Sequence, residues 1–258
     1  MSNPFILYNN LLPGASIITV TSEASGYEKE NAYNYLTWDH WKPSASGTVY
    51  YTVDLGSAQS IDAWGVVAHN LGNNSASIKL QYSDTGAWAG EEVDVGTAVS
   101  PDTTETIMKT FTSLSKRYWR WEIVSASAAS QIGLLFLGVK MEMPSGLGVG
   151  FAPDALAPQY EPRYNLSDDS ALLGASLYKK PIKNTMKFKL LTPAWVRANW
   201  EPFLRHVEQN KGFLYQPQPD DYPSEVVYAF ADKKKIKAPK YSQTKFMSVD
   251  LGYIGTVA

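Results

Sequence analysis

The sequence contains no cysteine among its 258 residues. This absence excludes a disulfide framework, a thiolate metal site and a cysteine nucleophile. An excess of one charge is also missing, because 23 basic residues stand against 25 acidic ones. Without a basic field, the composition does not favour nucleic acid as a partner. No segment approaches the ~20 apolar residues of a membrane span.

The first residues, MSNPFILYNNLLPG, have neither the basic region nor the long apolar core of a signal peptide. We therefore expect synthesis in a cytoplasm without an export signal. The apolar side chains of this stretch are too many for a free tail. We interpret residues 1–15 as an arm that packs on a neighbouring domain or on another subunit.

Familiar catalytic patterns are also missing. His40, His69 and His206 lie far apart in the sequence, so no pair has the spacing of metal ligands. The sequence has no nucleophile elbow and no phosphate-binding loop. Two Asp-Asp pairs, at 168–169 and 220–221, lie in turn-like stretches, where aspartate commonly bonds its own backbone. We predict that the protein is not an enzyme and carries no cofactor.

Residues 48–88 show the clearest pattern in the chain. Alternation over 50–55 and over 78–83, with an apolar run at 61–68 between them, predicts three strands separated by turns. Further strands are predicted at 16–21, 104–111, 118–124 and 132–143. No segment in this half has a helical period, so we predict an antiparallel jelly-roll sandwich over 16–143.

Five short pieces of this half resemble the discoidin family, also called the coagulation-factor C-type domain. They are Asn31–Asn34 followed by Thr37-Trp38 and Trp41, then Val53-Asp-Leu-Gly56, the Ile61-x-x-x-x-Val66 strand, Tyr82-Ser-Asp-Thr-Gly-x-Trp88 and Lys116–Ile123. The resemblance covers about residues 15–143. It implies a jelly-roll sandwich whose loops at one end commonly bind glycans, and sometimes membranes or proteins.

A glycan site needs aromatic planes and polar side chains that satisfy hydroxyl groups. The residues of this sequence that fit are Tyr35, Trp38, His40, Trp41, His69, Asn70 and Trp88. A structural interpretation stands beside each of the main ones. In the family, the aromatics matching Trp38 or Trp41 and Trp88 are often core residues, and His69 could instead be a turn residue that bonds the backbone.

Family members commonly hold a structural calcium ion with an aspartate in the opening loop and a glutamate in the final strand. Here the first position is Asn34, and Gly133–Leu137 offers no glutamate. Calcium needs several hard oxygen ligands. This departure counts against a calcium site.

Residues 144–158 are rich in Gly, Pro and Ala and predict a linker, which leaves 159–258 as a second domain. A helix is predicted over 193–211, with Thr192 as N-cap, Pro193 at the first position and Gly212 after its end. Pro202 predicts either a kink or two shorter helices.

The second domain resembles small β-barrel-plus-helix domains of long-tailed phage tail proteins. The resemblance rests on Leu191-Thr-Pro193 through Asn210–Pro217, a helix ending in a Gly followed by a Phe-containing strand and a Pro loop. Ala68-His-Asn-Leu-Gly72 also looks like phage structural proteins. The resemblance implies a distal-tail, tail-tip or baseplate subunit of the virion tail, which forms a ring with copies of itself and with other tail proteins.

The basic cluster Lys233–Lys237 is interpreted as a solvated loop or as a contact with an acidic neighbouring subunit.

We therefore predict a mainly β chain, a discoidin-like sandwich followed by a small barrel with one packed helix. The first functional hypothesis is a structural tail protein whose sandwich contacts host-surface glycans. The alternative is a free carbohydrate-binding module, or lectin, without catalysis. A third, an accessory part of a glycoside-active enzyme, is disfavoured because no catalytic carboxylate pair is apparent.

Overall fold

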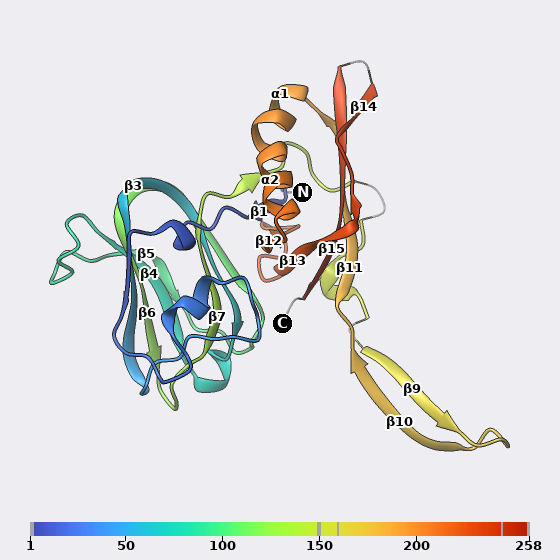
Figure 1. The fold of residues 1–258 in the computed structure, drawn as a ribbon, viewed down its shortest axis with the longest axis horizontal. Coiled ribbons are helices and arrows are strands. Elements are labelled where there is room, and N and C mark those ends of the chain that lie inside the picture. The colour runs from blue at the N-terminus through green and yellow to red at the C-terminus, as the bar shows by residue number, and fades with distance from the viewer. Residues whose placement is uncertain (1–2, 149–150, 159, 244, 257–258) are drawn as a thin grey trace.

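The computed structural model describes residues 3–148, 151–158, 160–243 and 245–256. The chain is mainly β, as predicted: a jelly-roll sandwich is followed by a barrel-type sheet with one packed helix (Figure 1). No helix formed by these residues is long and apolar enough to cross a membrane. Residues 149 and 150 of the predicted linker, and the predicted domain start at 159, lie outside the described residues.

The sandwich is built around two long, bent strands. Its strands are β2 (Ile17–Val20), β3 (Gly47–His69), β4 (Ser77–Ser83), β5 (Val93–Val99), β6 (Ile107–Ser125) and β7 (Ile132–Gly138). The order is β2-β3-β6-β4-β5, and β7 also pairs with β3. Short 3-10 turns lie at Leu12–Gly14, Lys29–Tyr33, Gly72–Asn74 and Asp154–Leu156.

The expected separate strands on either side of Gly56 are one strand, β3, and the strands expected at 104–111 and 118–124 are one strand, β6. The two pair along both halves, with a break in register between Asp54 and Gln59. Gly56 has a φ of 78°, which a glycine adopts without steric cost. Because of this bend, β3 contributes to both layers of the sandwich. Its first half pairs with β2 in one layer, and its second half pairs with β7 in the other.

Side-chain alternation on β3 and β6 gives the sandwich its core. Tyr51, Val53, Trp119 and Trp121 are fully buried between the layers. The opposite layer contributes Trp64 to the same cluster. The tryptophan face of β6 is therefore its core face.

The second domain is a seven-stranded antiparallel sheet that both halves of the chain build. Its strands are β1 (Phe5–Leu7), β8 (Met141–Glu142), β11 (Ile182–Leu191), β12 (Phe213–Gln216), β13 (Val227–Ile236), β14 (Lys240–Gln243) and β15 (Phe246–Thr256). The order is β11-β15-β13-β12-β1-β8, with β14 on β15. The N-terminal residues thus pack on the second domain of their own chain. The expected basic loop after Asp232 instead belongs to β13 as far as Ile236, and β13 and β14 each pair with β15.

The helical segment divides into α1 (Pro193–Trp195), a π-helical turn (Val196–Trp200) and α2 (Glu201–Glu208). Thr192 caps it, since its Oγ1 accepts a hydrogen bond from the Trp195 N–H at 3.3 Å. The predicted end at 211 was too late, because the left-handed residue after the helix is Asn210, with φ 60°. Gly212 has another role: a Cβ there would overlap the ring of Tyr228.

The two domains share an apolar interface. Alternate residues of β3 and β7 that point away from the sandwich core form a cluster with the second sheet; its buried members are Leu7, Ala63, Val67, Met108, Leu134, Phe136, Leu214, Val226 and Tyr228. Gly65 lies at the closest approach, where a Cβ would overlap the side chain of Leu214. This contact holds the sandwich against the second domain.

A hairpin of β9 (Tyr160–Leu166) and β10 (Leu172–Lys179) forms a separate two-stranded sheet. Figure 1 shows it projecting away from the rest of the molecule, beyond the end of β11. It connects through Pro181 to β11.

Candidate functional site

The seven residues predicted for a glycan site do not gather in one place. Trp41 is 0% exposed, forms an isolated bridge with Ile132 and packs edge-on against Tyr51 at 5.2 Å between ring centroids. Trp41 is therefore the core residue that the alternative interpretation of the two loop tryptophans expected. A sugar ring has no access to it in this structure.

His69 and Asn70 stabilise the turn that follows β3 through side-chain hydrogen bonds to the backbone. The Nε2 of His69 lies 2.8 Å from the carbonyl of Glu105, and its Nδ1 accepts from the N–H of Leu71 at 3.3 Å. Burial lowers the pKa of His69 and thus favours the neutral ring. The Oδ1 of Asn70 accepts from the Gln131 N–H at 2.7 Å. Both side chains thus bond backbone, which is a structural role.

Trp88 lies on the outward face of the sandwich, in a network of its own. The guanidinium of Arg120 lies between the rings of Trp88 and Tyr50, 4.4 Å and 4.3 Å from their centroids. Arg120 Nε donates to Gln81 at 2.6 Å, and Gln81 in turn donates to Asp94. These groups satisfy one another, which is typical of a stabilising network.

Tyr35 ties the long loop between β2 and β3 to the second domain. Its carbonyl accepts a hydrogen bond from the Tyr228 hydroxyl at 2.9 Å. Its ring packs edge-on against Phe136 and His206, with centroids 6.0 Å and 5.9 Å away. The residue has a φ of 64°, so the loop turns sharply at this point.

Trp38 differs from the other candidates because 75% of its surface is exposed. The loop around it is held by hydrogen bonds. The Asn34 amide donates to the Asp39 carboxylate at 3.2 Å, and the Asn31 amide donates to the His40 carbonyl at 3.1 Å. The indole is therefore presented on an ordered loop, beside the partly exposed His40.

A groove of about 380 Å³ begins next to this loop. Its lining comes from the loop, from β3, from the base of the hairpin and from β15: Thr37, Val67, Ala68, Lys179, Lys180, Pro181 and Gly255. The ammonium of Lys180 lies 2.7 Å from the carboxylate of Glu161. An exposed aromatic plane beside polar and cationic groups can bind a saccharide, whose C–H face stacks while its hydroxyls bond.

The part of the chain that the structure describes contains no group of three His, Asp or Glu side chains placed to hold a metal ion. The most buried carboxylate, Asp154, accepts hydrogen bonds from Tyr253 and Asn184. Burial raises the pKa of Asp154 against these two hydrogen bonds. No local pattern predicted this network, which secures the linker to β11 and β15.

The groove residues were also missed from the sequence, because they come from four separate segments, near residues 37, 67, 180 and 255. Thr37 and Lys180 belong to different domains and meet only through the apolar interface. No local spacing encodes such a meeting.

Comparisons with known proteins give structural likenesses only. No protein-family model matches the chain, and no curated protein matches it. A chitosan-binding module of a chitosanase/glucanase from Paenibacillus sp. IK-5 is 20% identical, with a TM-score of 0.43, and covers 50% of this chain and 98% of its own. A CBM32 module from Clostridium perfringens, solved with GalNAc-beta-1,3-galactose, is 15% identical, with a TM-score of 0.43, over 50% of this chain and 99% of its own.

Proposed function

We propose that the protein is a non-catalytic glycan-binding protein and that its ligand stacks on Trp38. The observation that carries the proposal is the 75% exposure of this indole on a hydrogen-bonded loop. An indole exposed to this extent offers a flat apolar face, and a ligand that covers this face removes apolar area from water. Trp41, three residues later, shows that the same loop buries an indole where the core needs it.

The neighbours of Trp38 suit a sugar. Asp39 offers a carboxylate acceptor, and His40 offers a ring nitrogen. Across the groove, Lys179 and Lys180 bring ammonium groups. Ammonium groups favour saccharides that carry a carboxylate or sulfate, although the Lys180 pair with Glu161 reduces this preference. A screen should therefore include uronate, sialylated and neutral glycans.

The test is a glycan array followed by calorimetric titration of the best ligand. We expect Trp38→Ala to weaken binding at least ~10-fold, since stacking and desolvation on one exposed aromatic supply about 1.4 kcal/mol or more. Leu36→Ala is the matched control, because Leu36 is an exposed apolar residue of the same loop. Equal affinity of wild type and Trp38→Ala would refute the proposed site.

A second candidate function is that of a structural subunit of a phage tail, forming a ring with copies of itself and contacting other tail proteins in the virion. Besides the resemblance of the second domain, one observation favours assembly: the β9–β10 hairpin exposes seven large apolar residues between 49% and 70%. In this case the sandwich is an outward module for host-surface glycans. Electron microscopy of the native particle tests it, and a particle without this chain in its tail would refute it.

A further inference from the structure

The second sheet has one face toward the helix and one face away from it, the far face. On β15 the side chains toward the helix are Met247, Val249, Leu251 and Tyr253. Because strand residues alternate, the residues of β15 on the far face are Ser248, Asp250, Gly252 and Ile254. The sandwich covers part of the far face, where Tyr228 and Phe230 of β13 pack in the apolar interface. The far-face residues of β11, β14 and β15 lie outside that interface.

Three lysines are placed on the far face by the strand register. Lys183 is the partner of Ile254, Lys187 of Asp250 and Lys240 of Ser248. Cross-strand partners share a face, so all three lysine side chains lie on the far face. All three are exposed. Two of them come from β11 and one from β14, so they flank β15 on both sides.

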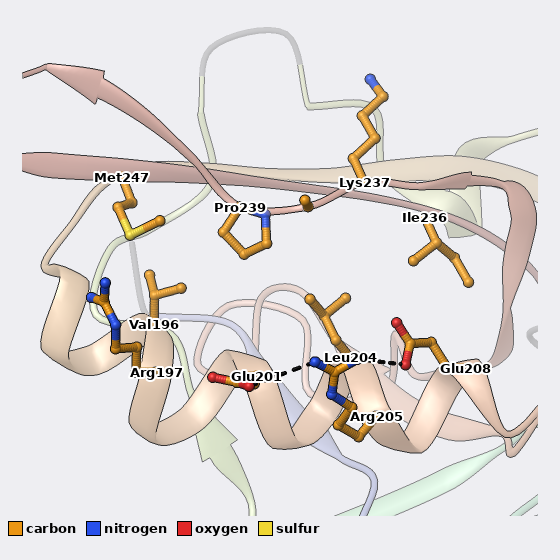
Figure 2. Close-up of a pocket in the computed structure, with 11 residues that line it drawn as sticks. Val196, Arg197, Glu201, Leu204, Arg205, Glu208, Ile236, Lys237, Pro239 and Met247 are labelled. Carbon is orange, nitrogen blue, oxygen red and sulfur yellow. Dashed lines mark hydrogen bonds and ion pairs between the residues drawn. The ribbon is translucent and has the colours of Figure 1, made fainter.

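The bulge of β13 adds two more lysines between them. A Cβ on Gly252 would lie 2.6 Å from the Cβ of Lys235, so this side chain lies against β15 on the far face. The Lys237 ammonium lies 3.5 Å from the Asp250 carboxylate. Figure 2 shows this ammonium pointing away from the helix, while the neighbouring Ile236 points toward the helix. We name these five residues the lysine face: Lys183, Lys187, Lys235, Lys237 and Lys240.

Nearby carboxylates balance only two of these five charges. Lys237 pairs with Asp250, and Lys235 lies 3.8 Å from Asp232. The other three lysines form no ion pair with a described residue. Lysines at a sheet edge commonly prevent pairing with a foreign strand, and β11 and β14 are edge strands. Lys235 and Lys237 lie against the interior strand β15, so edge protection does not account for the whole lysine face.

The lysine face continues from the groove beside the loop between β2 and β3. Gly255 and Lys180 line that groove. The next pair of residues along the two strands is Ile254 with Lys183, the first residue of the lysine face. From Gly255 to Ser248, β15 extends about 23 Å at ~3.3 Å per residue. A ligand that covers both the groove and the lysine face is therefore an extended chain.

The polar groups of the lysine face suit an acidic polysaccharide. Ammonium groups bind carboxylate or sulfate groups, and Thr185, between Lys183 and Lys187, adds a hydroxyl that can bond a sugar. Single-stranded nucleic acids instead stack their bases on aromatic side chains. The far-face residues of β15 from Ser248 to Ile254 and their partners on β11 and β14 include no aromatic residue. This composition favours sugars over bases.

We propose that the lysine face binds an acidic polysaccharide, a chain of uronate or sulfated sugars that runs from the groove along β11 and β15. The proposal rests on the proposed glycan-binding function and names its ligand class. Because the attraction is between charges at an exposed surface, added salt weakens it.

The test is a calorimetric titration of the full chain at two salt concentrations. The probes are polygalacturonate, its uncharged methyl ester, dextran sulfate and oligodeoxythymidylate. The face variant is Lys183→Gln with Lys187→Gln, since glutamine removes the charge and keeps a polar side chain. The matched control is Lys109→Gln with Lys211→Gln, which removes the same charge at positions on β6 and after α2.

We expect wild type to bind polygalacturonate or dextran sulfate, more weakly as salt is added, and to bind the methyl ester far more weakly. The anionic polymer that binds more tightly identifies carboxylate or sulfate as the recognised group. The face variant should bind that polymer at least ~10-fold more weakly than wild type, while the control variant stays close to wild type.

Four results would overturn the proposal. They are equal affinity of wild type and the face variant, an equal loss in the control variant, no binding of either anionic polymer, and tighter binding of oligodeoxythymidylate, which would indicate nucleic acid.

Trp38→Ala in the same titrations separates this proposal from the Trp38 site. If binding of a glycan depends on Trp38 while the face variant binds the anionic polymers like wild type, only the lysine face is refuted. If the face variant loses the anionic polymers while Trp38→Ala binds every glycan like wild type, the Trp38 site is refuted and the lysine face stands.

Discussion

Replacing Trp41 by alanine tests whether the loop between β2 and β3 belongs to the sandwich core. Trp41 is 0% exposed and contacts Tyr51 edge-on. Truncation of a buried tryptophan costs about 3–5 kcal/mol. At ~2–4 °C per kcal/mol for a chain of this size, the melting temperature should fall by about 6–20 °C. Trp38→Ala should change stability by less than ~0.5 kcal/mol, since it is a surface substitution.

The assay is thermal and urea unfolding of wild type, Trp41→Ala and Trp38→Ala, each monitored by far-ultraviolet circular dichroism. The slopes of the urea transitions are compared. Trp41→Phe is the control. It keeps the ring contact and removes a buried indole N–H that has no hydrogen-bond partner among the described residues. We expect Trp41→Phe to retain most of the stability. Trp41→Ala within ~1 kcal/mol of wild type, or an equal loss in Trp38→Ala, would refute the core assignment.

Three further predictions concern the interface and pH. Gly65→Ala should lower the free energy of unfolding by ~1–3 kcal/mol, because the new Cβ overlaps Leu214; an unchanged urea midpoint would contradict this. Burial lowers the pKa of His69 in the folded protein from the ordinary value of 6.5. The contribution of the neutral ring to the free energy of unfolding is therefore complete above pH 6.5 and is lost as the pH falls through the folded pKa. His69→Gln should flatten the dependence of stability on pH below 6.5. The hydrogen bond from Arg117 lowers the pKa of Asp54 from 3.8. The contribution of the Asp54–Arg117 pair to the free energy of unfolding is complete above pH 3.8 and is lost as the pH falls through the folded pKa of Asp54. It amounts to ~1 kcal/mol or less because Arg117 is partly exposed. Unfolding of Asp54→Asn in acid checks this.

Local alternation was enough to predict the faces of the sandwich strands. Tyr51 and Val53 are buried while Tyr50 and Thr52 face outward, because successive strand residues point to opposite sides. The same rule could not predict that β3 runs on through Gly56. Whether a glycine ends a strand or bends it depends on the partner strand, here β6, which lies far along the chain.

The strand pairings of the second sheet show more clearly what a local sequence pattern cannot predict. The apolar character of Phe5–Leu7 predicted packing on some neighbour, but only the fold reveals that β1 lies between β12 and β8. These strands lie more than a hundred residues away from β1, so no local pattern carries the pairing.

The candidate site was predictable in residue type and not in position. Trp38 and Trp41 are both tryptophans in one loop, and the sequence left the core position open between them. The structure separates them, because Trp41 bridges to Ile132 of β7 while Trp38 has no place in either layer. Trp88 satisfied the same chemical criterion, yet its ring stacks on Arg120 on another face.

The most direct test of the central claim is a titration of the best array glycan into wild-type protein and into Trp38→Ala, each observed through the tryptophan indole resonances. We predict that one exposed indole shifts on binding and that this resonance is the one missing in Trp38→Ala, which binds at least ~10-fold more weakly. A glycan that binds both proteins equally, or that shifts only the Trp88 resonance, would contradict the account.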